Sequence, residues 1–230
     1  MNNILPPVKE ALVAMIKGFA DGHDQISKAD AESFQNELIP LFTQIGDFPR
    51  KMNDLHVIIR NKPVFAPLEE YLFDLLMLNF IGSDSTKLDP DYLESEEWMK
   101  IEDDTADRGS ELLNILLYIT EAAQEERAID LADFLEEFLL TDDELYQDEY
   151  FIYEEVIRQA ALADSSINEI VKAGKQVKAD ELQELFIPMM TFFNAVGNEE
   201  SKYKALQEEA YNRQVNLAIL SALQAYQSSF

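Results

Sequence analysis

Hydrophobic residues recur along this chain at spacings of three and four residues, which is the repeat of an α-helix with one buried face. The first such stretch follows two prolines, Pro6 and Pro7, which suit the start of a helix, and it ends near Gly22. Its apolar positions fall on one face, and they are Val8, Leu12, Met15, Ile16 and Phe19. The pattern therefore predicts an amphipathic helix at the beginning of the chain.

The same spacing predicts helices along most of the remaining chain, and two of them carry an N-terminal signal. Ser27 with Asp30, and Ser166 with Glu169, have the residue types and the separation of a capping box. Residues 54–60 are apolar but short, and they fit a helix or a strand equally. The other helices are expected at residues 28–45, 68–81, 92–101, 110–124, 127–140, 142–162, 167–174, 178–196 and 199–227. We expect an all-α fold of about nine or ten helices, arranged as a single-domain helical bundle or a short helical array.

Two neighbouring stretches bear on the domain organisation. Residues 68–81 are apolar nearly all round, which predicts a central, buried helix. Residues 82–90 combine Gly, Pro, Ser and Asp and are the clearest candidate for a linker. We expect one domain over residues 1–230, and if the linker divides it, the halves are 1–82 and 90–230.

One short pattern occurs twice in the chain. An Ile-Pro step follows a Lys-Ala-Asp sequence and precedes a threonine, once at Ile39-Pro40 and once at Ile187-Pro188. One interpretation is a duplication that produced two halves related by a pseudo-two-fold axis. The other is two unrelated helices, each kinked by its proline and built from common helix residues. The sequence leaves both interpretations open.

The composition is that of a globular protein. Apolar residues make up 47% of the chain, which is enough for a sizeable core and too much for a disordered acidic protein. There is no cysteine, so disulfides and thiolate metal sites are excluded. The chain lacks the features of a signal peptide and of a membrane-spanning stretch. We therefore expect a cytoplasmic protein.

Acidic residues are concentrated in one part of the chain. The formal net charge is −27, and residues 84–155 hold 25 acidic residues against four basic ones, a balance of −21. This charge disfavours direct binding to nucleic acid or to an anionic membrane, because both require lysine and arginine. It suits a basic protein surface or a divalent cation, and it also serves solubility alone.

Four carboxylates of this segment are candidates for a binding site. They are Glu126, Asp130, Asp133 and Glu137. Their separations of four, three and four residues place them on one face of the helix expected at residues 127–140. Such a row can face solvent or a basic partner. As an alternative, it can supply the oxygen ligands that Mg²⁺ or Mn²⁺ prefers.

A cluster of tyrosines follows among further acidic residues. Its members are Tyr146, Tyr150 and Tyr153. Tyrosine offers apolar area together with a hydroxyl group and is common in interfaces. Aromatic rings beside carboxylates fit a surface that holds lysine or arginine, unless the rings pack into the core.

The remaining residue types exclude several enzyme classes. Neither His23 nor His56 belongs to a Glu-x-x-His or His-Glu-x-x-His motif, and there is no Gly-x-Ser-x-Gly sequence or glycine-rich phosphate loop. We therefore expect a non-enzymatic adaptor or inhibitor that binds a basic protein partner and needs no cofactor. The alternative is a Mg- or Mn-dependent hydrolase of a phosphorylated small molecule that uses the four carboxylates. A third hypothesis is a structural module whose acidity serves only solubility.

Overall fold

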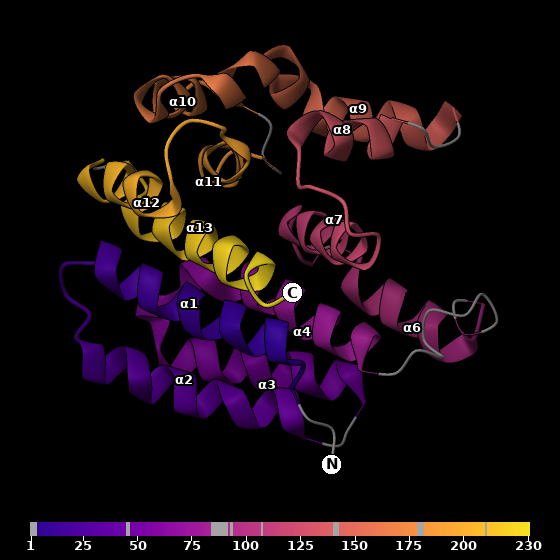
Figure 1. The fold of residues 1–230 in the computed structure, drawn as a ribbon. Coiled ribbons are helices and arrows are strands. Elements are labelled where there is room, and N and C mark those ends of the chain that lie inside the picture. Colours follow the sequence, from indigo (N-terminus) through magenta and orange to yellow (C-terminus); the bar gives the residue numbers. More distant parts are fainter. Residues whose placement is uncertain are drawn as a thin grey trace.

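Helices account for the regular structure in the part of the chain that the structure describes. This computed structural model describes residues 4–44, 47–83, 92, 94–106, 108–139, 143–178, 182–209 and 211–230. These residues form twelve α-helices and two 3-10 helices and contain no strand (Figure 1). The predicted all-α fold is confirmed, with more helices than expected.

The first four α-helices form the lower part of the molecule in the view of Figure 1. With the 3-10 helix η1 they are α1 (Pro6–Gly22), α2 (Lys28–Thr43), α3 (Phe48–Asn61), η1 (Pro63–Leu68) and α4 (Glu69–Gly82). α1 packs against α2 and α4, and α3 packs against α2 and α4.

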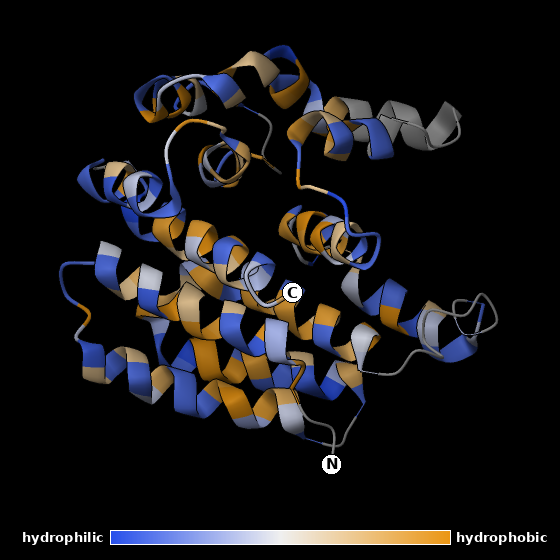
Figure 2. Ribbon diagram, in the orientation of Figure 1, coloured by the Kyte–Doolittle hydropathy of each residue, from blue (hydrophilic) through white to orange (hydrophobic). Residues whose placement is uncertain are grey.

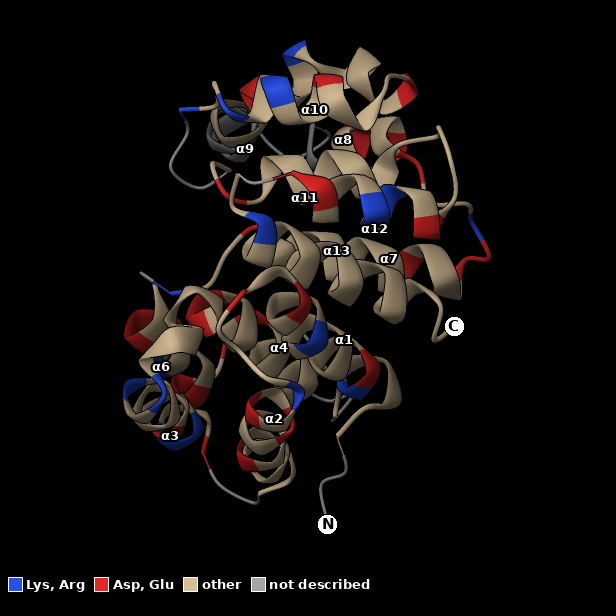
Figure 3. Ribbon diagram, turned by 90° about the vertical axis from the view of Figure 1, so that its left-hand side faces the viewer, with Lys and Arg blue, Asp and Glu red and all other residues tan. Residues whose placement is uncertain are grey.

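α6 (Glu96–Thr105) lies beside α3 in the same lower part. The later helices form the upper part, and they are α7 (Leu112–Gln124), α8 (Leu131–Leu139), α9 (Asp143–Arg158), η3 (Ala160–Asp164), α10 (Ile167–Gly174), α11 (Phe186–Phe193), α12 (Glu199–Glu208) and α13 (Arg213–Gln227). α13 contacts α7, α11 and α12, while α7 also packs on α4. α10 packs on α11, and α8 packs on α9. α13 carries one charged residue, Arg213 at its start, in keeping with its central place (Figure 3).

The two capping boxes expected from the sequence are present. At the start of α2 the Asp30 carboxylate accepts hydrogen bonds from the backbone N–H (3.0 Å) and the hydroxyl (2.6 Å) of Ser27. At the start of α10 the Glu169 carboxylate accepts from the same two groups of Ser166, at 3.1 and 2.9 Å. Each box satisfies a backbone N–H near a helix start, where the helix itself offers no acceptor.

α4 is the buried helix that the sequence predicts at residues 68–81. Ten of its fourteen residues are buried, and in Figure 2 it is largely apolar, as is α7. One of its buried polar side chains, Asn79, accepts a hydrogen bond from the Leu5 N–H (2.9 Å) and donates one to the Phe42 carbonyl (3.4 Å). These bonds tie α4 to the residue before α1 and to the end of α2.

α1 and α13, the first and last helices, make the most extensive contact between two helices in the described part of the chain. A Cβ atom added to Gly18 would lie 2.4 Å from the carbonyl oxygen of Leu217, and one added to Gly22 would lie 2.5 Å from the Cα of Gln214. The two glycines therefore let the backbones approach directly. Arg213 adds a hydrogen bond to the Gly22 carbonyl at 2.9 Å.

Buried apolar side chains form one continuous cluster that extends from Val8 in α1 to Tyr226 in α13. The contacts of α1 with α13 and of α4 with α7 join the parts of the chain before and after residues 84–90, so the fold is a single helical domain. No helix of the described residues is both long enough and apolar enough to cross a membrane.

One open assignment is decided by the structure, and two segments differ from their expected form. Residues 54–60, which fit a helix or a strand, belong to α3. The single helix expected at 199–227 is two helices, because Glu209 is extended after α12 (ψ 133°) and Asn212 is left-handed before α13 (φ 44°). Neither conformation continues a right-handed helix. Within the stretch expected at 178–196, the only helix among the described residues is the short α11.

The two Ile-Pro steps lie in different surroundings. Pro40 is exposed in α2, whereas Pro188 is buried in α11, a helix in which every residue is buried. The duplication therefore stays a hypothesis. Residues 84–90 of the expected linker lie outside the described residues, so the division into halves also stays a prediction.

We expect Gly18→Ala to lower the free energy of unfolding by roughly 1–3 kcal/mol through overpacking, even though alanine is intrinsically favoured in a helix by about 1 kcal/mol. The matched control is Gly82→Ala, whose Cβ would meet only the end of the flexible Leu5 side chain. Urea unfolding followed by circular dichroism measures both. Equal losses in the two variants would contradict the importance of the α1–α13 contact.

Candidate functional site

The four carboxylates expected on one helical face do not share one. α8 begins at Leu131, so Glu126 and Asp130 precede it. Glu126 is exposed, with a φ of 55°, in the turn after α7. Asp130 caps α8, and its Oδ1 accepts hydrogen bonds from the backbone N–H groups of Ala132 (2.9 Å) and Asp133 (3.2 Å). The single-face prediction is wrong because a carboxylate placed just before an apolar stretch acts as a helix cap.

The other two carboxylates, Asp133 and Glu137, surround Arg127 together with two acids from the end of α7. Arg127 is paired with Asp133 and lies 2.5 Å from Glu125, 3.8 Å from Glu121 and 3.9 Å from Glu137. We call these five residues the Arg127 cluster. One cation thus serves four carboxylates.

The pKa values of Glu137 and Arg127 are both raised in the Arg127 cluster, where negative charge is in excess. Burial, followed by a hydrogen bond and charge repulsion from Glu121, raises the pKa of Glu137 to about 7. Loss of solvation alone would lower the pKa of Arg127, but the hydrogen bond to Glu125 and the charge of Asp133 raise it. Glu137 is therefore partly protonated near neutral pH.

Of the three tyrosines of the predicted interaction surface, the structure describes the side chain of Tyr153, which is buried. Tyr153 is 1% exposed; its hydroxyl donates to Glu111 at 2.6 Å and its ring meets that of Phe134 edge-on at 5.5 Å. Tyr153 thus anchors α9 in the core. Tyr146 and Tyr150 belong to α9, and their side chains lie outside the described residues.

The Mg or Mn alternative has no support from the arrangement of ligands. Among the described residues, no three or more Asp, Glu or His side chains gather in the manner of a metal site. Asp130 is occupied in capping α8, and Asp133 is paired with Arg127. The hydrolase therefore stays an untested alternative.

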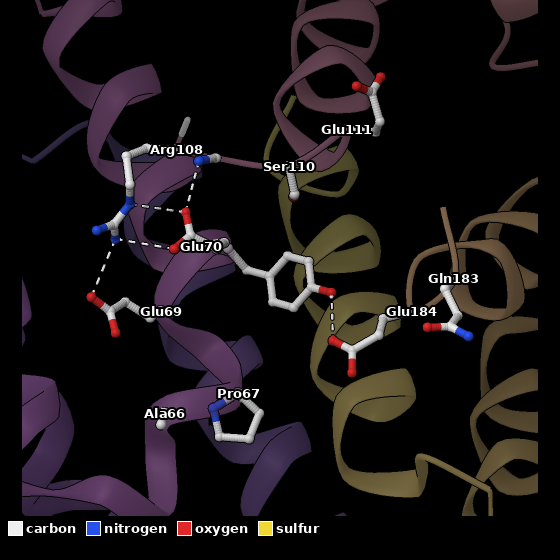
Figure 4. Close-up of a pocket in the computed structure, with 11 residues that line it drawn as sticks. Ala66, Pro67, Glu69, Glu70, Arg108, Ser110, Glu111, Gln183 and Glu184 are labelled. Carbon is white, nitrogen blue, oxygen red and sulfur yellow. Dashed lines mark hydrogen bonds and ion pairs between the residues drawn. The ribbon is translucent and has the colours of Figure 1, made fainter. Parts of the chain in front are cut away.

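A hollow of about 630 Å³ lies between the start of α4, the loop from α6 to α7, and the residues before α11 (Figure 4). We call it the acidic cavity, because its lining contains four carboxylates and one cation. These charged residues are Glu69, Glu70, Arg108, Glu111 and Glu184. They come from three stretches that are distant in the sequence.

Arg108 neutralises one side of the acidic cavity. Its Nη2 lies 3.2 Å from Glu69 and 3.1 Å from Glu70, and its Nε donates to Glu70 at 3.2 Å. Glu69 also contacts a ring nitrogen of His56 at 2.9 Å. The two glutamates of the first turn of α4 therefore share one arginine.

The other side of the acidic cavity keeps its negative charge. Glu111 accepts hydrogen bonds from the Tyr153 hydroxyl (2.6 Å) and the Asn114 amide (2.9 Å). Glu184 accepts one from the Tyr71 hydroxyl at 3.2 Å (Figure 4). These donors are neutral, and within the described part of the chain neither glutamate forms an ion pair. Both carboxylates are thus held in place with their charge unopposed.

Two acids of α4, one helical turn apart, fix the wall of the acidic cavity. Glu70 accepts the N–H of Gly109 (2.7 Å), and Asp74 accepts the N–H (3.0 Å) and the hydroxyl (2.5 Å) of Ser110. Gly109 has a φ of 91°, and a Cβ there would lie 2.8 Å from the Asp74 carboxylate. The loop can approach α4 this closely because this residue is a glycine.

Two buried groups of α4 at the acidic cavity have raised pKa values. Burial is the main cause that raises the pKa of Asp74 to about 8; the Ser110 hydrogen bonds oppose it, and the charges of Glu70 and Glu111 add to it. Burial and the charge of Glu184 raise the pKa of Tyr71. Burial, the larger cause of both shifts, disfavours a charge of either sign, whereas the smaller contributions of Glu70, Glu111 and Glu184 reflect nearby negative charge.

The apolar spacing of the sequence does not predict the acidic cavity, although one signal in it points to the cavity. Glu70 and Asp74 interrupt a stretch that is otherwise apolar nearly all round, and their spacing of four places them on one face of the helix. A buried carboxylate needs hydrogen-bond donors. The signal does not reveal which residues supply those donors.

Comparison with protein-family models, with curated proteins and with solved structures finds no match to this chain. The functional argument therefore depends on the residues themselves.

The titration of Asp74 predicts a pH dependence of stability. Its pKa is raised in the folded state, so its contribution to the free energy of unfolding falls as pH rises from about 4 to about 8, by at most roughly 1.4 kcal/mol per unit. We expect Asp74→Asn to gain stability relative to the wild type over this range, as measured by urea unfolding. Asp103→Asn, at an exposed position in α6, is the control and should run parallel to the wild type. A parallel profile for Asp74→Asn would contradict the raised pKa.

We expect Arg127→Gln to lower the midpoint of thermal unfolding, because four carboxylates then lose their shared cation. The loss should grow from pH 6 to pH 8, as Glu137 ionises, and shrink in salt, which screens the repulsion. Arg50→Gln is the control, since in the described part of the chain the Arg50 side chain has one ion-pair partner, Asp54, at 4.0 Å. The same loss in both variants would show that the Arg127 cluster has no special weight.

Proposed function

We infer that this protein binds a basic protein partner and that its acidic cavity receives a lysine or arginine side chain of that partner. The observation that carries this proposal is the pair Glu111 and Glu184. Both residues line the cavity, their carboxylates accept hydrogen bonds from neutral donors, and neither has a basic partner in the described part of the chain. A cationic side chain would provide the missing charge.

The size of the acidic cavity agrees with this role. Its volume of about 630 Å³ is within the range of roughly 300–1,000 Å³ that is usual for ligand pockets. Hydrogen bonds from Tyr153 and Tyr71 hold the two free carboxylates before a ligand arrives. A site that is already ordered loses less entropy on binding.

The wider charge distribution favours encounter with a basic partner. Arg108 and Arg127, two of the four bases in the acidic segment, are already shared among several carboxylates. The surplus charge therefore remains available to the surroundings. A negative surface accelerates association with a positive one and makes binding weaken as salt is added.

The proposal predicts the effect of removing the two free charges. The probe is a fluorescently labelled peptide of eight arginines, and fluorescence anisotropy at low and high salt measures its affinity. We expect Glu111→Gln combined with Glu184→Gln to weaken binding at least tenfold, because a hydrogen bond to a charged group contributes roughly 1.5–3 kcal/mol. The amides keep an acceptor for Tyr153 and Tyr71, so the fold should be retained.

The matched control is Glu96→Gln combined with Glu97→Gln. These acids are exposed at the start of α6, in the same acidic segment, and they do not line the cavity. The control removes the same charge and should change the affinity by less than about threefold. Equal weakening by the two double variants would show that net charge alone attracts the peptide, and the proposal would then fail.

A further inference from the structure

A second hollow, of about 430 Å³, lies between α8, the segment from the end of α9 through η3, and the end of α11. Its floor is apolar and consists of Leu131, Leu135, Ile157, Ala160, Ala163 and Phe193. We call it the α8–η3 groove. Large apolar side chains therefore line a recess that is open to the surface.

The edge of the α8–η3 groove is acidic. Asp130, Glu136 and Asp164 line it and are exposed, and no lysine or arginine belongs to its described lining. An apolar floor with an acidic edge is complementary to an apolar group that has positive charges beside it.

The walls of the α8–η3 groove are joined to each other. The buried Asn194 amide, just after α11, donates to the carbonyl groups of Ala163 (2.8 Å) and Ser165 (2.9 Å). The Ala195 N–H also donates to Ala163 at 2.8 Å. Phe193 stacks on Phe134 of α8 at 5.5 Å. The groove is thus formed before any partner arrives, which reduces the entropy lost on binding.

We propose that the α8–η3 groove binds an amphipathic helix of the basic partner. The apolar face of this helix fills the groove, and its lysine or arginine residues lie against Glu136, Asp164 and Asp130. Helices that dock in this way place residues at i, i+3 or i+4, and i+7 in an apolar groove. The inference rests on the proposed function in one respect, which is that the partner is basic.

Charge decides between this occupant and a second copy of the chain. Each copy carries a net charge of −27, and the edge of the groove is itself negative. A second copy would bring like charges together, which opposes association. A helix with lysine or arginine beside its apolar face meets no such repulsion.

The test uses two synthetic peptides of eighteen residues that contain only leucine and lysine in equal proportion. In the first, the leucines lie on one helical face. In the second, the same residues are permuted so that no such face exists. We expect the wild type to bind the first peptide at least ten times more tightly in isothermal titration calorimetry. Equal affinities for the two peptides would overturn the proposal.

A pair of variants locates the preference. Ala163→Leu fills the α8–η3 groove without changing charge, and we expect it to bind the two peptides equally. Ala161→Leu makes the same change at an exposed position of η3 that does not line the groove, and it should keep the tenfold preference. A preference that survives Ala163→Leu would refute the groove as the binding site.

A charge variant tests the edge of the groove and decides the outcome if Ala163→Leu does not fold. We expect Glu136→Gln combined with Asp164→Asn to lower the affinity for the amphipathic peptide. The fold loss should be at least five times that caused by Glu96→Gln combined with Glu97→Gln. Asp130 is left unchanged because it caps α8. Equal weakening by the two double variants would overturn the proposal.

The same measurements separate this inference from the proposed function. Glu111→Gln combined with Glu184→Gln alters only the acidic cavity, so it should retain the preference for the amphipathic peptide. If the wild type did not bind octa-arginine, the proposed role of the acidic cavity would be refuted, whereas the preference for the amphipathic peptide would still test the groove. Loss of the peptide preference alone would remove the groove and leave the cavity.

Discussion

Direct backbone contact between α1 and α13 holds this fold together, because it joins the two ends of the chain and supports the helices on either side. α1 packs against α2 and α4, while α13 packs against α7, α11 and α12. The contact requires glycine at positions 18 and 22, since a side chain there would meet backbone atoms that cannot move aside. The helix pair thereby joins buried residues from both ends of the sequence into one continuous core.

This core limits where the acidic residues lie. Among the described residues most remain exposed, and the carboxylates around Arg127 and Arg108 share a cation. Asp74 is buried within α4. Its raised pKa keeps it largely protonated at neutral pH, which avoids the large free-energy cost of a buried charge. Charge therefore gathers at the surface and in the acidic cavity, where water or a basic group can reach it.

Features with a local origin were predictable from the sequence. The apolar spacing predicted the helical class, the capping pairs located the starts of α2 and α10, and an all-round apolar stretch marked α4 as buried. The start of α8 was misplaced because the spacing of Asp130 fits a helical face and a helix cap equally. The break between α12 and α13 depends on the backbone conformations of Glu209 and Asn212, which the surrounding pattern does not reveal.

The acidic cavity could not be predicted in the same way. Its charged walls come from residues 69–70, 108–111 and 184, and no periodic pattern relates segments so far apart. The sequence placed a charged residue in a buried helix, but only the tertiary structure shows that Ser110 is its partner. The α8–η3 groove is similar, since its apolar residues look like ordinary core positions until the opening between the helices is known.

The pairing of the first helix with the last has a consequence for synthesis of the chain. Arg213 follows Gly22 by 191 positions, which at 5–20 residues per second corresponds to roughly 10–40 s of translation. During this interval the apolar stripe of the first helix has emerged from the ribosome without its final partner. The nascent polypeptide thus exposes the apolar face of its first helix for most of its elongation. Chaperones, or early packing of this face against the second and fourth helices, protect it from aggregation.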